Sequence, residues 1–254
     1  MKRWLTAIAS IAFVLMSVHG ALAQDEITLI APNIMRGPME QIIQGYEAKT
    51  GRKVKATFGA ELGTRQQIVG GEAVDVPVVE LPDADVIASG NVVASTETTI
   101  ASISIGLAVR KGAPKPDIST GDALKRALLA AKSISYPDPS GGAAAGVSVT
   151  DALKKLGIAD QVQSKTKTAQ GGARAMAQVA GGDAEIGMTL LPGMTDAGID
   201  IVGPLPREVS PPTVVVGFVS SHAKDPAAAK DLLAYLASPE AMAIYKAQKM
   251  QPGR

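Results

Sequence analysis

The chain has 254 residues and is nearly neutral, with 25 lysines and arginines against 24 aspartates and glutamates. It therefore lacks the basic excess of a nucleic-acid-binding protein. With no cysteine and two histidines, it offers neither disulfides nor the His-rich sites of zinc enzymes. Aromatic residues make up only 3% of the chain, so stacking platforms for sugars or planar cations are scarce, and we expect a small, compact anion as ligand.

Residues 1–23 are predicted to be a secretory signal peptide. Lys2 and Arg3 precede a short apolar run, and Ala21-Leu22-Ala23 has the small-residue pattern of a cleavage site. The run is shorter than the ~20 residues that a membrane-spanning helix needs. We therefore expect an exported protein that begins at Gln24 and does not span the membrane.

Strands and helices alternate in the segment that follows. The expected strands are 27–30, 54–58 and 75–79, and the expected helices are 38–49, 64–69 and 83–90. Such alternation is typical of an α/β fold with a parallel sheet, in which ligands bind beyond the carboxyl ends of the strands. Asn33, Thr64 and Ser140 fall at such positions.

The middle of the chain carries a crossing strand and a strand-loop-helix junction. Residues 98–109 are long for one strand of a compact domain and could cross between lobes, and Ser119 with Asp122 resembles a capping box before the next helix. Residues 133–146 read as a strand, a tight Pro-Ser-Gly-Gly loop and a helix N-terminus. The free backbone N–H groups at such a terminus can hold a small anion, although glycine and serine also suit an ordinary β-to-α turn.

The last third continues the alternation. Strands are expected near 165–168 and at 184–191, 199–203 and 213–219, with a helix from Gln170 to Gly181. The run 213–219 would cross back between lobes. Two C-terminal helices are predicted where a capping residue precedes proline, at Asp225-Pro226 and Ser238-Pro239.

Seven motifs follow one another along the chain: A-P-N, K-T-G, G-A-E-L-G-T-R-Q-Q-I, V-R-K-G-A-P-K-P-D-I, Y-P-D-P-S-G-G, G-D-A-E-I-G and K-D-P-A-A-A-K-D-L-L-A-Y-L-A-S-P-E. Their order and spacing resemble periplasmic solute-binding proteins of ABC importers, in the branch similar to molybdate-binding proteins. The resemblance implies an α/β fold of two Rossmann-like lobes joined by two crossing strands, the type II periplasmic binding protein. Lobe 1 would comprise 24–104 and 212–254, lobe 2 would comprise 105–211, and hinge closure would hold a ligand between them.

Carried over position by position, the resemblance implies four ligand-binding loops. Their residues are Ala31, Pro32, Asn33, Leu62, Gly63, Thr64, Ser140, Gly141, Gly142, Ala143, Thr189 and Leu190. Molybdate binders typically present hydroxyls in the first two loops and a tyrosine after the late strand, where this chain has Asn33, Glu61 with Leu62, and Leu190. An ionised carboxylate has no proton to donate to an oxyanion. The ligand therefore stays open among molybdate, tungstate, another oxyanion and a small carboxylate.

Arg36 and Arg65 lie beside the first two loops. Either could clamp a carboxylate with two hydrogen bonds, and either could be an ordinary solvated surface arginine.

The function expected from these features is capture of a small anion in the periplasm and its delivery to the membrane permease of an ABC importer. We expect a monomer without catalytic activity, metal or cofactor. One alternative is an exported enzyme that uses Glu61 and Asp138 as acid and base, which requires pKa values displaced in opposite directions. The other is a ligand-sensing protein with the same fold.

Overall fold

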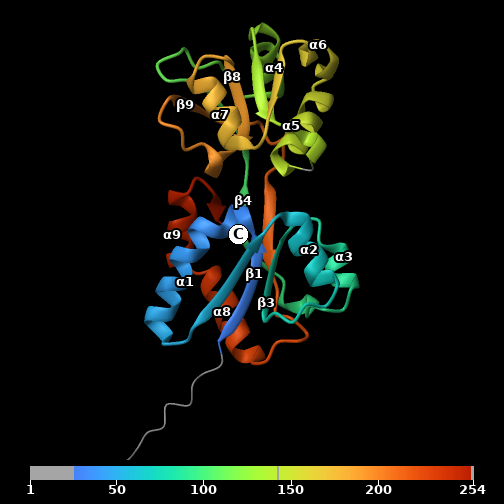
Figure 1. Ribbon diagram of the computed structural model, residues 1–254, viewed down its shortest axis with the longest axis vertical. Helices are drawn as coiled ribbons and strands as arrows, with labels where there is room; N and C mark the ends of the chain where they lie inside the picture. Colours follow the sequence, from blue (N-terminus) through green and yellow to red (C-terminus); the bar gives the residue numbers. More distant parts are fainter. Residues whose placement is uncertain (1–25, 142, 253–254) are drawn as a thin grey trace, which may run out of the picture.

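The computed structural model describes residues 26–141 and 143–252. The expected signal peptide and Gly142 lie outside these residues. The chain forms two α/β lobes stacked along its longest axis (Figure 1), which confirms the predicted fold class. We call the lobe built on the six-stranded sheet the first lobe and the one built on the five-stranded sheet the second lobe. The exact lobe limits given above stay a prediction.

The first lobe has sheet order β11-β4-β10-β3-β1-β2. Its strands are β1 (Ile27–Pro32), β2 (Val54–Gly59), β3 (Val76–Glu80), β4 (Thr98–Ile103), β10 (Thr213–Gly217) and β11 (Gln251–Pro252). Its helices are α1 (Arg36–Thr50), α2 (Glu61–Val69), α3 (Ala84–Ala88), α8 (Pro226–Leu236) and α9 (Pro239–Ala247), with 3-10 turns η1 (Asn33–Met35) and η2 (Ala94–Thr96).

The second lobe has sheet order β7-β6-β8-β5-β9. Its strands are β5 (Ile105–Arg110), β6 (Ile134–Pro137), β7 (Thr166–Ala169), β8 (Ile186–Leu190) and β9 (Ile199–Pro204). Its helices are α4 (Gly121–Ala130), α5 (Ala144–Lys155), α6 (Ala159–Gln163) and α7 (Gly172–Ala180), with 3-10 turns η3 (Pro139–Gly141) and η4 (Leu191–Gly193).

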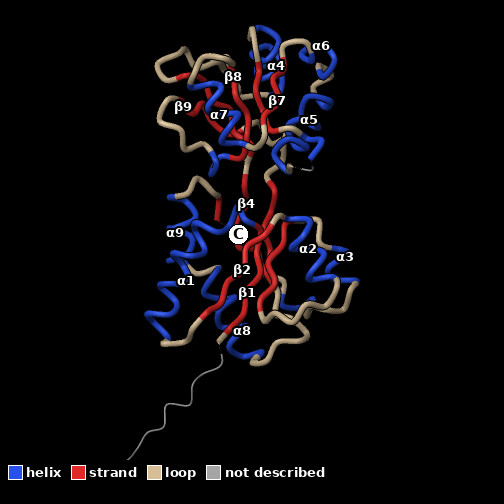
Figure 2. Tube along the Cα trace, viewed as in Figure 1, coloured by secondary structure: helices blue, strands red, loops and turns tan. Residues whose placement is uncertain are grey.

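Both sheets are covered on their two faces by helices (Figure 2), which explains the nearly continuous apolar strands. In β3, Val78 packs with α1, α8 and α9, whereas the next residue, Val79, packs with α2 and α3 on the opposite face. This is the alternation that a strand imposes on successive side chains. In the second lobe one core contains residues of α4, α5 and α6, and the other contains residues of α7.

The strand directions bring the carboxyl ends of both sheets to the interface between the lobes. In the first lobe β10 is antiparallel to both β3 and β4, and β1 and β2 are parallel to β3. These parallel strands therefore all end on the side where β4 leads into β5. In the second lobe Ile105, at the start of β5, pairs with Leu190, the last residue of β8, and β6 and β7 run parallel to β8. The loops after β1, β2, β3, β6, β7 and β8 therefore face the opposite lobe.

Several element boundaries differ from the predicted ones. The run 98–109 is two strands that belong to different sheets, β4 and β5, with Ser104 between them. Helix α2 begins at Glu61 instead of Thr64. The cap of α4 is Thr120, whose hydroxyl accepts the N–H of Ala123, instead of Ser119. The helix after the Pro-Ser-Gly-Gly loop begins at Ala144, after a 3-10 turn.

The C-terminal helices agree with their predicted caps. The side chain of Asp225 accepts the N–H groups of Ala227 and Ala228 at the start of α8. Ser238 caps α9 in the same way by accepting the N–H of Ala241. Proline occupies the first helical position of both helices, where no N–H is needed.

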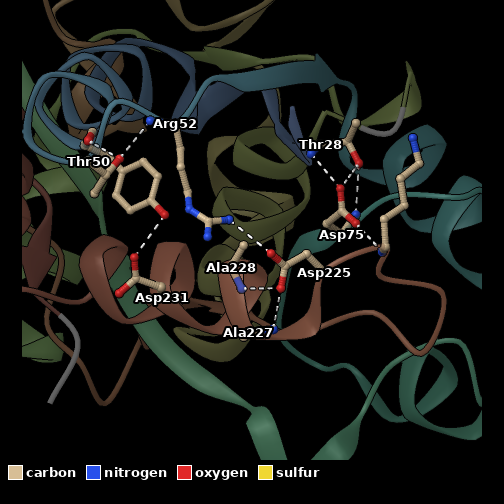
Figure 3. A network of polar contacts seen from close by, with 10 residues as sticks. Thr28, Thr50, Arg52, Asp75, Asp225, Ala227, Ala228 and Asp231 are labelled. Carbon is tan, nitrogen blue, oxygen red and sulfur yellow. Dashed lines mark hydrogen bonds and ion pairs between the residues drawn. The ribbon is translucent and has the colours of Figure 1, made fainter. Parts of the chain in front are cut away.

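A polar network ties the base of the first lobe together (Figure 3). Buried Asp75 accepts the backbone N–H and the hydroxyl of Thr28 on β1 and the backbone N–H of Lys224, which precedes α8. Arg52, which follows α1, lies 3.1 Å from the carboxylate of Asp225. The network therefore ties β1 and the end of α1 to the start of α8, at the edge of the sheet opposite the second lobe.

Within residues 26–141 and 143–252, every helix is too short or too polar to traverse a lipid bilayer.

Candidate functional site

The N-terminus of α2 borders an open hollow on the first lobe. Its first turn has Ala60 at the cap position, with no side-chain cap, so the backbone N–H groups there are free to bind a ligand. Thr64 is completely buried, and its Oγ1 atom has no hydrogen-bond partner among the described residues. A hollow beside it is lined by Gly59, Ala60, Gly63, Thr64, Gln66 and Gln67. An anion there would find free N–H donors and a hydroxyl without a partner.

Arg65 is fixed one turn further along α2. Its Nη1 atom donates to the carboxylate of Asp85 at 2.7 Å and to the carbonyl oxygen of Pro82 at 2.8 Å. Its Nη2 atom donates to Oε1 of Glu61 at 3.0 Å and to the carbonyl oxygen of Glu80. Because both terminal nitrogens already bind acceptors, Arg65 organises this edge of the lobe instead of presenting a free guanidinium.

Two carboxyl groups at this edge have raised pKa values. Burial raises the pKa of Glu61, although the neighbouring Arg65 opposes that rise. Its Oε2 atom is buried without a hydrogen-bond partner in the described part of the chain. Glu80 closes β3, and burial together with the charge of Glu61 raises its pKa to about 7. The first lobe therefore presents a carboxyl group that holds a proton near neutral pH.

At the end of β1, only one of the three predicted binding residues is exposed. Ala31 and Pro32 are buried within the sheet, whereas Asn33 is accessible. The guanidinium of Arg36 lies 3.4 Å from Oδ1 of Asn33 and 4.8 Å from the ring centroid of Phe58. Its weak 3.5 Å pairing with exposed Glu40 leaves Arg36 available to an anionic ligand.

On the second lobe, the loop after β6 holds an ionised carboxylate. Oδ1 of Asp138 accepts the backbone N–H of Ser140 at 2.9 Å, and this hydrogen bond lowers the pKa of Asp138. Ser140 is exposed, and Ala143 stands at the cap position of α5 without a side-chain hydrogen bond. A Cβ on Gly146 would overlap the carbonyl oxygen of Pro137, so this glycine lets α5 start directly against the end of β6.

Both predicted residues of the late strand of the second lobe make contacts within the protein. Thr189 is buried beneath Gly172, the first residue of α7. Leu190 is half-buried and packs against the main cores of both lobes. In this conformation its side chain serves interlobe packing.

The predicted residues therefore gather on the two facing edges. Asn33, Leu62, Gly63 and Thr64 lie on the first lobe, and Ser140, Gly141, Ala143, Thr189 and Leu190 lie on the second, while Gly142 lies outside the described residues. Glu80 was not among them. A signal was present, because an acidic residue directly after the apolar run V-P-V-V stands where a ligand-facing loop begins. No group of three His, Asp or Glu side chains in the described ranges could hold a metal.

A family model described as bacterial extracellular solute-binding protein matches residues 27–250. The chain belongs to this family. A molybdate-binding protein of Azotobacter vinelandii is 30% identical over 234 residues, which cover 89% of this solute-binding protein and 90% of the relative. Among solved structures, the substrate-binding domain of a proposed molybdenum ABC transporter from Clostridium difficile superimposes with a TM-score of 0.79. Its identity is 18%, and the match covers 89% of this chain and 98% of the other. The resemblance to periplasmic proteins of the molybdate-binding type is thereby confirmed.

One relative corrects the expected function. An aconitate isomerase from a Pseudomonas species is also 30% identical over 234 residues, covering 89% of this solute-binding protein and 87% of the enzyme. The prediction of a protein without catalytic activity is therefore wrong. It rested on the scarcity of histidine, cysteine and aromatic residues, but proton transfer needs only carboxyl groups with displaced pKa values.

Proposed function

We propose that this solute-binding protein binds a small polycarboxylate between its lobes and isomerises it by proton transfer, with aconitate as the first substrate to test. The aconitate isomerase among its relatives supports the substrate class. The observation that carries the proposal is that carboxyl groups on the two facing edges have pKa values shifted in opposite directions. The pKa values of Glu61 and Glu80 are raised on one lobe, and that of Asp138 is lowered on the other.

Such a pair suits the interconversion of aconitate isomers. Aconitate is a propene tricarboxylate, so its double bond lies beside a methylene carbon. A base takes a proton from the methylene carbon, the double bond moves by one position, and an acid gives a proton to the former vinyl carbon. The reaction needs no oxidant or reductant. Ionised Asp138 would accept the first proton, and a protonated carboxyl of the first lobe would supply the second.

The charges of the substrate would be met by the anion-binding features of the two edges. On the first lobe these are the free N–H groups and Thr64 hydroxyl at the start of α2, together with Arg36. On the second lobe they are Ser140 and the start of α5. Glu61 opposes an anionic ligand less than a free carboxylate would, because its charge is paired with that of Arg65.

Turnover is tested with the mature protein from Gln24 and either isomer of aconitate, followed by proton NMR in D2O. We expect interconversion with deuterium entering the substrate. Replacing Asp138 by Asn should lower kcat about a hundredfold or more. The matched control is Asp151→Asn on α5, whose exposed carboxylate pairs with Lys154 and whose loss should leave kcat unchanged. The proposal fails if neither isomer changes.

A second function, delivery of a bound anion to the permease of an ABC importer, is supported by the family and by the molybdate-binding relative. We propose a monomeric protein in the periplasm for this role. A thermal-shift panel of molybdate, tungstate, sulfate, phosphate and small carboxylates separates the ligand classes. A ligand at a hundredfold excess over Kd adds about 2.7 kcal/mol of stability. Stabilisation by molybdate and tungstate alone would contradict the polycarboxylate assignment.

A further inference from the structure

We propose that Glu80 is the proton donor of the isomerisation and that Glu61 is the positioning residue that keeps this proton on Glu80. The inference rests on the proposed function. It chooses between two neighbouring carboxyl groups of the first lobe and assigns them different tasks.

The position of Glu80 favours the donor role. It is the last residue of β3, the strand between β1 and β10, and it pairs with Val215 of β10. The register with β1 places Ile30 beside Pro77, and extending it by three residues brings Glu80 level with Asn33. Glu80 therefore lies between the exposed end of β1 and the strand that returns from the second lobe. It is half-buried, so a ligand can reach its carboxyl group.

The contacts of Arg65 explain why Glu80, and not Glu61, keeps the proton. Arg65 donates to the carboxylate of Glu61 but to the main-chain carbonyl oxygen of Glu80. Its other terminal nitrogen is taken by Asp85 and Pro82. The charge of Glu61 is thus neutralised by a direct ion pair, whereas no ion pair involves the Glu80 carboxylate among the residues that the structure describes.

The surrounding charges oppose one another at Glu80: the carboxylate of Glu61 raises its pKa, and Arg65 lowers it by less. Glu61 and Arg65 reach this point from α2, Asp85 from α3, and the facing residues of β10 are apolar valines. Arg36 of α1 is directed toward Asn33 and Phe58. The backbone N–H of Glu80 also lies 3.4 Å from Oε1 of Glu61, which holds the two residues in a fixed relation. Burial beside an ionised Glu61 therefore favours neutral Glu80.

The proton balance is closed. Neutral Glu80 gives its proton to the vinyl carbon and becomes a carboxylate, while Asp138 takes the methylene proton and becomes neutral. The reverse reaction or exchange with water restores both groups. Because turnover requires protonated Glu80, activity should fall as the pH rises through about 7.

The test compares pH profiles of kcat for aconitate in the wild type, Glu80→Gln and Glu61→Gln. A matched control is Glu72→Gln, an exposed glutamate in the loop before β3. We expect Glu80→Gln to lower kcat at least a hundredfold with KM within threefold, and to remove the alkaline limb. Glu61→Gln should keep more activity and move that limb to lower pH, because the charge that opposes ionisation of Glu80 is gone. Circular dichroism confirms that each variant is folded.

The outcomes separate the two proposals. If the wild type is active and Glu80→Gln stays within threefold of it with the alkaline limb unchanged, the donor assignment is overturned. An unmoved limb in Glu61→Gln overturns the positioning role. A wild type that interconverts neither isomer overturns the proposed function itself, and the donor role with it.

Discussion

Thr64 lies directly below Gly59 at the start of α2: a Cβ on Gly59 would stand 3.0 Å from the Thr64 hydroxyl oxygen. That oxygen is buried and has no partner among the described residues. An unpaired buried hydroxyl costs stability, and the ligand proposed above would supply the missing partner. We expect Thr64→Val to leave the unligated protein as stable or more stable by about 1 kcal/mol, and to weaken polycarboxylate binding about tenfold.

Thermal unfolding and titration calorimetry measure these two effects separately. Thr57→Val on β2 is the matched control, because Thr57 is exposed on the neighbouring strand. If Thr64→Val destabilises the unligated protein and keeps full affinity, the hydroxyl has a structural role instead.

A prediction for folding stability follows from Glu80. Its folded-state pKa of about 7 lies above the ordinary glutamate value of 4.5, so the folded state binds more protons than the unfolded state between these two pH values. The favourable contribution is present below about pH 4.5 and is lost as the pH rises through about 7. Glu80→Gln stays neutral at all pH values. We therefore expect the variant to gain about 1 to 3 kcal/mol relative to the wild type between pH 4.5 and 8.

Urea unfolding at both pH values measures this gain, with Glu72→Gln as the control that should show none. An equal stability difference at both pH values would mean that Glu80 ionises normally in the folded protein.

Gly146 should be intolerant of any side chain. A Cβ there would overlap the carbonyl oxygen of Pro137 and stand 2.9 Å from the backbone nitrogen of Pro139. We expect Gly146→Ala to cost about 1 to 3 kcal/mol through overpacking and to displace the start of α5. Gly37→Ala in α1 meets no atom within 4 Å and should stabilise by up to about 1 kcal/mol. Equal melting temperatures for the two variants would show that α5 can move away freely.

The cap of α9 gives a simpler stability test. Ser238→Ala removes the acceptor for the N–H of Ala241 and should cost about 1 kcal/mol. Ser148→Ala, inside α5, is the matched change without a cap and should stay within about 0.5 kcal/mol of the wild type. Calorimetric melting compares them, and similar losses in both would argue against the capping role.

The sequence predicts best where a local pattern decides the structure. The caps at Asp225 and Ser238 agree because capping depends on the residue and its next three neighbours. The lobe limit was predicted after Ser104, but the break into two strands there was not. Strands β4 and β5 form one apolar run, and only pairing with distant strands assigns its halves to different sheets. The early start of α2 was missed because Gly63 disfavours a helix, while the Glu61–Arg65 pair across one turn favours it.

Chemistry at the site was the least predictable part. Asn33, Thr64 and Ser140 follow from the rule that ligands bind beyond strand ends, and the structure places all three on the facing edges. The properties of Glu80 depend on burial and on where Arg65 points, and both arise from tertiary packing. A list of residue types therefore suggested simple capture, whereas their arrangement supports proton transfer.

The position of β10 has a consequence for the order in which the chain folds. The second-lobe strands lie in one continuous segment, and β10, made after all of them, is the strand that joins β4 to β3 in the first lobe. Until β10 emerges from the ribosome, β4 cannot join the sheet formed by β3, β1 and β2. The second lobe can thus complete its sheet before the first lobe does. The first lobe, although its synthesis begins earlier, stays exposed to proteases and to aggregation for longer.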